Sequence, residues 1–294
     1  MKKVQVLMST YNGERFLREQ LQSLLNQTYP NLEILIRDDG SRDATASILQ
    51  EYANKYSNVH VYLEENVGAV HSFFWLLSRC DADYAAFCDQ DDVWLPEKVE
   101  RAVEKLQRVK GPGLYCSNKI LVDSNLRVIS DNKGQKLRPG FGNAVVESIC
   151  TGCTALLNRE LVLDIQKHIP RNAIIHDWWC YLAASYTGRV IFDERAFIWY
   201  RQHEHNVIGA SAGFWDVVKA KAAYLKKSRG KLKLQLEEFA AAYHSDREKD
   251  QLLQLLLGTG KLRGKLRAFF CRSYYRQSKL DGLITRILIL FNYI

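Results

Sequence analysis

Hydrophobic positions follow two alternating periods over the first third of the chain. Four short apolar runs without polar alternation are typical of strands covered on both faces; they are residues 4–8, 32–36, 59–63 and 84–88. Apolar residues between these runs recur at helical spacing, in residues 16–25, in residues 43–56 and around Phe73 and Leu77. The pattern predicts an α/β fold, with a mostly parallel sheet flanked by helices and right-handed crossovers.

Charge divides the chain into two predicted units. Residues 1–213 hold 24 Lys and Arg against 26 Asp and Glu, whereas residues 214–294 hold 17 against 7, a net charge of +10. Such an asymmetry indicates a basic helical extension with an acidic partner, joined near residues 209–213 to a main domain. Overall, 47% hydrophobic and 25% charged residues exclude a disordered or fibrous chain.

The extension has the pattern of basic amphipathic helices. Its last apolar residues form one helical stripe of Leu280, Leu283, Ile284, Ile287, Leu288 and Phe291. Cations alternate with apolar residues upstream, namely Lys261, Arg263, Lys265, Arg267, Arg272 and Arg276. We expect a surface anchor on anionic lipid, where each nearby cation contributes about 1 kcal/mol. The alternative is a set of helices packed on the main domain or on another subunit; nucleic-acid binding is disfavoured because no recognition motif is present.

Neither a leader nor a membrane span is expected. Lys2 and Lys3 run directly into the first apolar strand, and the longest aliphatic run near the end, residues 287–291, is far shorter than the ~18 residues of a spanning helix. We therefore expect a cytoplasmic protein that touches the membrane at its surface. The seven Cys residues are interpreted as reduced thiols, with Cys150 and Cys153 in a tight turn rather than a metal site.

Polar segments follow three of the predicted strands, at the edge where parallel sheets bind ligands. These segments are Ser9–Gly13, Arg37–Ser41 and Asp89–Asp92. The aromatic ring, hydroxyl and carboxylate groups of the first two suit a nucleoside, whose base needs a flat apolar face and an acceptor for its ring N–H. For the second segment, a simple turn followed by a helix cap is an equal alternative.

The third segment places Asp89, Asp91 and Asp92 within four residues at the end of a buried strand. Such carboxylates repel one another, and a bound cation is one arrangement that keeps them ionised. The cation that fits these carboxylates best is Mn²⁺ or Mg²⁺, which would complete its ligand shell with oxygens of a nucleoside diphosphate. The alternative is that Asp92 caps the helix that Pro96 opens, which would leave two carboxylates unexplained.

Several motifs in order resemble those of the family 2 inverting glycosyltransferases, which have the Rossmann-like GT-A fold. They are Ser9–Gly13, Gln27–Pro30, Asp38–Ser41, Glu65–Gly68 and Asp89–Pro96. Three later motifs resemble the bacterial rhamnosyltransferases of cell-wall, capsule and O-antigen synthesis, namely Thr151–Thr154, His176–Trp179 and Tyr200–Gly209. The resemblance covers residues 1–210.

The resemblance implies a role for individual residues. Ser9, Tyr11 and Asp39 would surround the base, with Asp89 near the ribose and Asp91 on the metal and diphosphate. Further donor contacts would come from Gly68, Arg201 and His203, while the role of His205 stays open. Asp177 would be the catalytic base, with Trp178 and Trp179 on the acceptor side; by its position alone, Asp177 could equally cap a helix.

The resemblance also implies a reaction and its partners. We expect an inverting, metal-dependent transfer of a sugar, with dTDP-L-rhamnose as the first choice of donor and UDP-hexoses next. The acceptor would be a glycan on a polyprenyl diphosphate lipid, at the inner face of the plasma membrane. A non-catalytic sugar-nucleotide-binding or membrane scaffold protein and a nucleotidyltransferase are the alternatives, and a homo-oligomer stays open.

Overall fold

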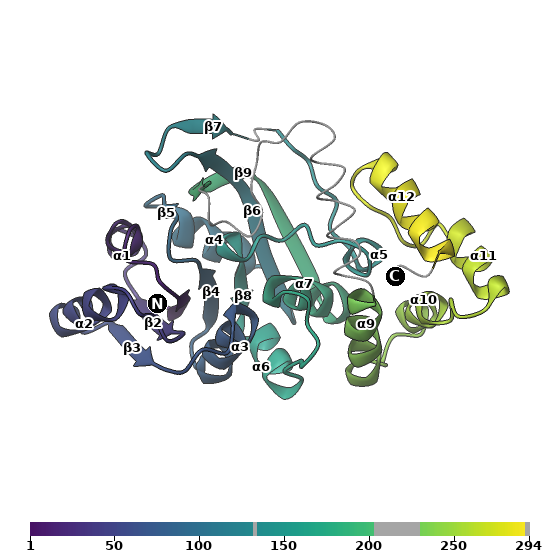
Figure 1. Cartoon of the computed structure of the whole chain (residues 1–294), viewed down its shortest axis with the longest axis horizontal. Helices are drawn as coiled ribbons and strands as arrows, with labels where there is room; N and C mark the ends of the chain where they lie inside the picture. Colours follow the sequence, from purple (N-terminus) through teal and green to yellow (C-terminus); the bar gives the residue numbers. More distant parts are fainter. Residues whose placement is uncertain (132–133, 203–229, 292–294) are drawn as a thin grey trace.

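A curled sheet with helices on both faces forms the centre of the molecule (Figure 1). The computed structural model describes residues 1–131, 134–202 and 230–291. The sheet has nine strands in the order β3-β2-β1-β4-β8-β6-β9-β5, with β7 paired to β6. Its first four strands are β1 (Val4–Thr10), β2 (Leu32–Asp38), β3 (Val59–Leu63) and β4 (Tyr84–Cys88). All their pairings are parallel, which confirms the predicted half of the sheet.

The first two strands extend two residues beyond their apolar runs. The parallel register of β1 and β2 continues through Ser9 with Arg37 and Thr10 with Asp38. The hydrogen-bonded ladder therefore carries polar residues out of the core, to the edge of the sheet where ligands bind in α/β folds.

The second half of the sheet is mixed. It consists of β5 (Val93–Trp94), β6 (Gly113–Val122), β7 (Val128–Ser130), β8 (Leu156–Asn158) and β9 (Arg189–Arg201). Strand β8 is antiparallel to β4 and to β6, whereas β6 and β9 are parallel to each other. Because β8 is antiparallel to both neighbours, β6 runs in the same direction as β4 on the other side of β8.

Two hydrophobic clusters cover the two faces of the sheet. On one face, Leu7 and Phe87 pack with helices α3 (Ala69–Arg79), α6 (Arg159–Lys167) and α7 (His176–Thr187). On the other, Val6 and Ala86 pack with α1 (Leu17–Leu25), α2 (Thr45–Lys55) and α4 (Lys98–Leu106). Successive strand residues point to opposite faces, so both faces need apolar residues, as the runs predict.

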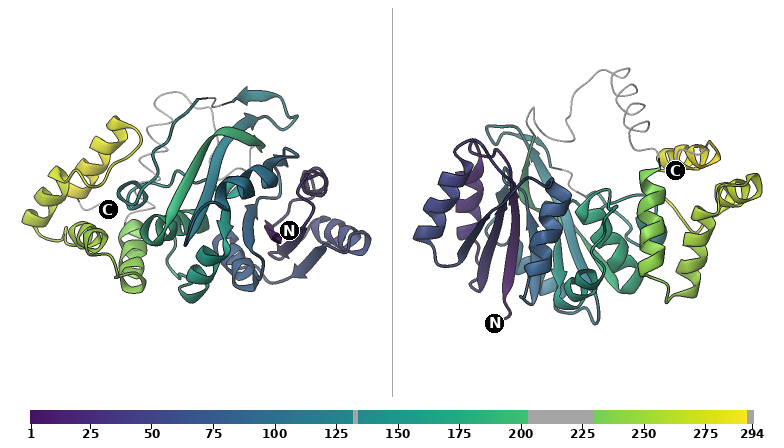
Figure 2. Two further views of the ribbon diagram at one scale, coloured as in Figure 1. Left: turned by 180° about the vertical axis from the view of Figure 1, so that it is seen from behind. Right: turned by 60° about the horizontal axis from the view of Figure 1, so that its bottom comes forward.

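The described part of the extension is helical, as predicted. Its helices are α9 (Lys231–Ala242), α10 (Arg247–Leu257), α11 (Leu262–Phe270) and α12 (Lys279–Leu290). Phe239 of α9 packs edge-on against Trp179 and Tyr186 of α7, with ring centroids 5.4 and 5.7 Å apart. Helices α11 and α12 form the end of the molecule opposite α2 (Figures 1 and 2). The predicted boundary at residues 209–213 lies outside the described residues.

Two further predictions concern membranes and thiols. Among the described residues, no helix is long and apolar enough to cross a bilayer. All seven cysteines are free thiols, and Cys153 lies in a 3-10 turn, Gly152–Thr154. The turn predicted here thus contains Cys153, whereas Cys150 lies before it.

Candidate active site

The three polar loops predicted at one edge of the sheet are hydrogen-bonded to one another. The backbone N–H of Tyr11 donates to Oε1 of Gln90 at 2.8 Å, and Nε2 of Gln90 donates to the Tyr11 carbonyl at 3.0 Å. Thr10 Oγ1 donates to Asp38 Oδ1 at 2.9 Å, which ties the β1 loop to the β2 loop. The loops thus form one surface rather than three independent turns.

The β1 loop carries the residues predicted to hold the nucleoside base. The Tyr11 side chain is 47% exposed, so one face of the ring can receive a stacked base. Ser9 is half-buried and its hydroxyl donates to Ser72 Oγ of α3 at 2.7 Å. The structure brings Ser9 and Tyr11 to the same edge of the sheet as the acidic loop.

Asp39 joins the β2 loop to the segment before α3. Its carboxylate is buried, pairs with the Arg37 guanidinium, and accepts hydrogen bonds from the backbone N–H groups of Val67 at 2.8 Å and Gly68 at 2.9 Å. Gly68 has a φ of +81°, which only glycine adopts without strain. Because the residue before α2 is Ala44, Asp39 is not a helix cap. Contact of Asp39 with a base stays a prediction.

The acidic loop after β4 holds one buried carboxyl group, Asp92, and two half-buried ones, Asp89 and Asp91. Burial, with the charges of Asp91 and Asp177, raises the pKa of Asp89 to about 7. Burial and the charge of Asp89 likewise raise the pKa of Asp92. Asp92 Oδ1 accepts the Arg201 backbone N–H at 3.0 Å, and helix α4 begins after Glu97, so Asp92 does not cap that helix.

Arg201, at the end of β9, holds the acidic loop in place. Its buried guanidinium donates to the carbonyls of Asp91 and Ser124, each at 2.7 Å, and pairs with the Glu19 carboxylate. These contacts satisfy the guanidinium within the protein, so Arg201 positions the loop. Direct contact of Arg201 with the donor stays a prediction.

One cluster of ligand atoms in the described residues can hold a cation. Carboxylate oxygens of Asp89 and Asp92 and the Sγ of Cys153 lie within 4.8 Å of one another. Asp92 Oδ2 is buried and has no hydrogen-bond partner in the part of the chain that the structure describes. Carboxylate oxygens, such as this one without a hydrogen-bond partner, are the ligands that Mg²⁺ and Mn²⁺ prefer. Asp91, the predicted metal ligand, belongs to the same loop but not to this cluster.

Asp177 faces this cluster from the start of α7. Its Oδ2 accepts the backbone N–H of Gly152 at 2.7 Å, whereas Oδ1 is buried and unpartnered among the described residues. Burial raises the pKa of Asp177 to about 7. The residue before α7 is Ile175, whose side chain makes no cap hydrogen bond, and Asp177 lies inside the helix. The alternative that Asp177 caps this helix is therefore wrong.

His176 fixes the neighbouring turn by packing. Its ring stacks on Phe73 at 3.9 Å between centroids and meets Phe87 edge-on at 4.7 Å. Burial lowers the pKa of His176 to about 3, so the ring is neutral. A Cβ on Gly152 would lie 2.7 Å from His176 Nε2 and 3.4 Å from Asp177 Oδ2. The approach of Gly152 to Asp177 therefore depends on the absence of a side chain.

The two tryptophans predicted on the acceptor side lie in different surroundings. Trp178 is half-buried, and its indole N–H donates to the Ala144 carbonyl at 2.7 Å. Trp179 is fully buried against Phe239 of α9. The structure places Trp179 in the core rather than at a surface an acceptor can reach.

Sequence reasoning missed three residues beside the carboxyl groups. Lys119 of β6 donates to Thr151 Oγ1 at 3.1 Å, and its charge lowers the pKa values of Asp89 and Asp177. Buried Lys98 lies 3.3 Å from the centroid of the Trp94 ring, and burial lowers its pKa to about 8. The Sγ of Cys153 lies within 4.8 Å of carboxylate oxygens of Asp89 and Asp92. All three reach the site through the mixed half of the sheet or α4, so no local motif marks them.

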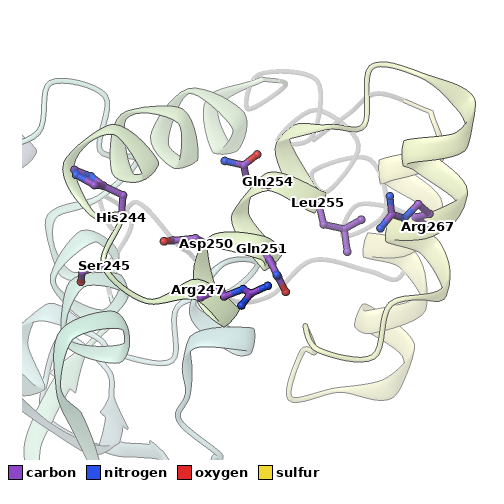
Figure 3. Close-up of a pocket in the computed structure, with 8 residues that line it drawn as sticks. All are labelled: His244, Ser245, Arg247, Asp250, Gln251, Gln254, Leu255 and Arg267. Carbon is purple, nitrogen blue, oxygen red and sulfur yellow. The ribbon is translucent and has the colours of Figure 1, made fainter.

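Two other places are distinct from this site. Predicted His203 and His205 lie outside the described residues. A cavity of about 800 Å³ between α10 and α11 is lined by polar residues such as Arg247, Asp250 and Arg267 (Figure 3). It contains none of the acidic-loop residues, so the candidate active site is assigned to the edge of the sheet.

Comparison with known proteins shows which family this chain belongs to. The sequence model for glycosyl transferase family 2 matches residues 5–165, which is more than half of the chain and runs from the second residue of β1 through β4 and the acidic loop. The chain belongs to glycosyl transferase family 2. The predicted family resemblance is thereby confirmed, and Asp89, Asp91 and Asp92 lie within the matched segment.

The family 2 glycosyltransferase has relatives of known name and structure. It is similar to the dTDP-rhamnosyl transferase RfbG of Shigella flexneri, with 31% identity over 220 residues that cover 70% of this chain and 75% of RfbG. The fold resembles S. aureus TarS 1–349, with a TM-score of 0.61, 19% identity and coverage of 99% of this chain and 81% of TarS. It also resembles the mannosyltransferase PcManGT from Pyrobaculum calidifontis in complex with GDP-Man and Mn²⁺, with a TM-score of 0.53, 18% identity and coverage of 99% and 86%. These likenesses confirm the GT-A fold.

Proposed function

We propose that this glycosyltransferase moves L-rhamnose from dTDP-L-rhamnose to a growing, lipid-linked bacterial surface polysaccharide, with inversion at the anomeric carbon. The similarity to RfbG over 70% of the chain supports the rhamnose donor. A UDP-hexose is the second candidate, because a structural neighbour, TarS, is known in complex with UDP-GlcNAc. No feature of the acidic loop by itself distinguishes the two donors.

The observation that carries the proposal is the environment of Asp177. One carboxylate oxygen is held by the Gly152 N–H, and the other is buried without a partner in the described chain. An acceptor hydroxyl would satisfy that oxygen by donating its proton to it. A buried carboxyl with a pKa near 7 is a stronger base than an exposed one, which suits proton removal as the hydroxyl attacks the anomeric carbon.

The acidic loop is proposed to hold the cation and the diphosphate. Asp91 stays the proposed direct ligand, with Asp89 and Asp92 supplying further negative charge beside it. A bound Mn²⁺ or Mg²⁺ would neutralise the charge that develops on the departing nucleoside diphosphate. The complex of PcManGT with GDP-Man and Mn²⁺ supports this assignment. Arg201 would act by keeping the loop in place through its bonds to Asp91 and Ser124.

The nucleoside is proposed to lie over the β1 loop. Exposed Tyr11 would stack on the base, with Ser9, Asp39 and Gly68 forming the polar wall of the same surface. Asp89 would face the ribose, as the resemblance implies. His203, outside the described residues, stays a proposed donor contact, and Trp178 a proposed acceptor contact.

A donor screen tests the proposed function. The full chain is incubated with dTDP-L-rhamnose, UDP-hexoses and GDP-mannose, with and without Mn²⁺, and release of nucleoside diphosphate is measured. We expect the largest release from dTDP-L-rhamnose with Mn²⁺ and none from Asp177→Asn. Release of pyrophosphate instead would indicate a nucleotidyltransferase, and binding of donors without any release would indicate the scaffold alternative.

The acceptor determines where the enzyme works. We propose a glycan on polyprenyl diphosphate, presented at the cytoplasmic face of the plasma membrane, and a basic extension that brings the enzyme to the anionic membrane surface. No nucleic-acid partner is proposed, and assembly into a homo-oligomer is an outcome that size measurement in solution would reveal.

A further inference from the structure

Helices α11 and α12 each expose large apolar side chains. The residues are between 38% and 73% exposed and come from both helices: Leu262, Leu266, Phe270, Leu280, Leu283, Ile284, Ile287 and Phe291. We call this set the hairpin face. The predicted apolar stripe of α12 is thus helical but points away from the protein, whereas apolar faces of helices normally cover a core.

The hairpin is nevertheless fixed to the rest of the molecule by its opposite side. Ala268, Tyr274, Thr285 and Ile289 are buried. The Tyr275 N–H donates to the Gly142 carbonyl at 2.9 Å. The exposed residues are therefore held in place by buried neighbours, so the hairpin face is a preformed surface.

An ion pair and a hydrogen bond from the loop between α11 and α12 to Glu147 reinforce this attachment. Arg276 pairs with the half-buried Glu147 at 3.1 Å, and its neighbour Gln277 donates its backbone N–H to the same carboxylate at 2.8 Å. Deleting residues 261–294 would break these contacts and uncover the region around Gly142. A test of the hairpin face must therefore use substitutions of exposed residues.

Charge decides what can cover the hairpin face. Residues 261–291 contain eight Lys and Arg and a single acidic residue, Asp281. The exposed cations include Lys261, Arg263, Arg267, Arg272 and Lys279. A second copy of the chain docked on this face would bring two such cationic sets together, which repel each other. An anionic bilayer offers both complements, acyl chains for the apolar residues and phosphate for the cations.

We propose that α11 and α12 lie in the interface of an anionic lipid bilayer, with the hairpin face toward the acyl chains and the surrounding Lys and Arg at the phosphates. This deepens the proposed function, because a lipid-linked acceptor would meet an enzyme already at the same surface. Docking itself requires no transfer activity, so it is measured separately.

Vesicle binding by the full chain tests the proposal. Vesicles of phosphatidylcholine with phosphatidylglycerol should retain the protein at low salt, and vesicles of phosphatidylcholine alone should retain much less. High salt should release it, because screening weakens the attraction of cations to phosphate. Absence of retention on phosphatidylglycerol vesicles at low salt would overturn the proposal.

Matched substitutions assign the binding to the hairpin face. Leu266→Ser with Phe270→Ser and Leu283→Ser should weaken vesicle binding on the order of tenfold or more, since these side chains would leave the acyl region. The control is Leu163→Ser with Ile169→Ser, two comparably exposed apolar residues elsewhere on the surface. Exposed side chains support no core, so melting temperatures should stay close to wild type; equal binding of both variants would overturn the assignment.

A charge pair and a size measurement complete the test. Lys261→Glu with Arg263→Glu should reduce binding, whereas Arg108→Glu with Lys110→Glu, exposed beyond α4, should not. A lipid-free wild-type dimer that the triple Ser variant converts to monomer would overturn the proposal and assign the face to contact between copies. If donor turnover is absent but vesicle binding persists, the proposed function fails and the docking proposal stands.

Discussion

The backbone N–H of Gly152 donates a hydrogen bond of 2.7 Å to Oδ2 of Asp177. This contact occupies Oδ2, whereas Oδ1 is buried without a partner in the described chain and is the proposed oxygen that receives the acceptor proton. The Sγ of the adjacent residue, Cys153, lies within 4.8 Å of carboxylate oxygens of Asp89 and Asp92. One short turn thus links the proposed base to the proposed metal site.

Asp177→Asn should abolish transfer while donor binding remains. The amide keeps the shape of the side chain but cannot take the acceptor proton, so kcat should fall by about a hundredfold to ten-thousandfold. The donor Kd, measured by calorimetry, should change little. Near wild-type turnover in this variant, together with an inactive His176→Ala, would show that the base is misassigned.

Gly152→Ala should impair both folding and catalysis. The new methyl would lie 2.7 Å from His176 Nε2, and the His176 ring has little room between Phe73 and Phe87. We expect a loss of about 1–3 kcal/mol in the free energy of unfolding and a lower kcat. Gly260→Ala is the control, because no described atom lies within 4 Å of its Cβ. Equal urea midpoints for the two variants would contradict the packing argument.

Asp91→Asn should weaken metal-dependent turnover without unfolding the protein. Asp91 is half-buried, and loss of one ligand charge would lower the affinity for Mn²⁺. The concentration of Mn²⁺ that gives half-maximal activity should rise, with the melting temperature unchanged. Glu97→Gln, just before α4, is the control for charge alone. A metal titration identical to wild type would remove Asp91 from the site.

Catalysis should depend on pH through Asp177. Because only the carboxylate form accepts a proton, and burial raises the pKa of Asp177 to about 7, kcat should rise as the pH increases through about 7. The measurement is kcat at saturating donor and acceptor between pH 5 and pH 9, in roughly unit steps. An acid limb near pH 4 would show that the base is an exposed carboxylate.

Stability should show the opposite dependence on pH. The folded state keeps the Asp177 proton up to about pH 7, whereas the unfolded chain releases it near 3.8, so the free energy of unfolding falls as pH rises between these values. Asp177→Asn has no proton to release, so its free energy of unfolding should not fall in this way. The variant should therefore gain stability over wild type as the pH rises, by on the order of a few kcal/mol at pH 8. The measurement is urea unfolding in EDTA at several pH values. A difference in the free energy of unfolding between the variant and wild type that does not vary with pH would contradict this account.

Tyr11→Ala should weaken donor binding because the ring is the proposed stacking face for the base. Loss of a base–aromatic stack of about 1–3 kcal/mol corresponds to a rise in KM for the donor of roughly fivefold to a hundredfold. Tyr11→Phe keeps the face and should bind like wild type. Equal KM values for the Ala and Phe variants would place the base elsewhere.

The sequence alone predicts the parallel half of the sheet because its signals are local. Each buried strand is a short apolar run, and the polar residues that follow, such as Ser9 and Asp89, stand directly beside it in the chain. The mixed half gives no such signal. Strand β8 has only three residues, and its antiparallel pairing with β4 joins residues that are 70 to 74 positions apart in the chain.

The same distinction separates predicted from missed site residues. Asp177 is predicted because a motif surrounds it, whereas the pairing of Arg201 with Glu19 spans 182 residues and has no pattern in the chain. Cys153 is interpreted from its spacing to Cys150, yet its neighbours in space are Asp89 and Asp92. Only the folded sheet, which places the turn after residue 151 beside β4, shows that relationship.

The packing of α9 on α7 has a consequence for anyone seeking the smallest working enzyme. A chain shortened to residue 213, where the charge pattern changes, would bare Trp179 and Tyr186, at roughly 1.5–3 kcal/mol for each large apolar side chain left in water. Those residues lie on the helix that begins beside Asp177, so truncation would loosen the base together with the core. The shortest catalytic unit therefore includes α9. The hairpin is also bonded to the body at Glu147, so it can be changed in its exposed residues, rather than removed, to suit different membranes.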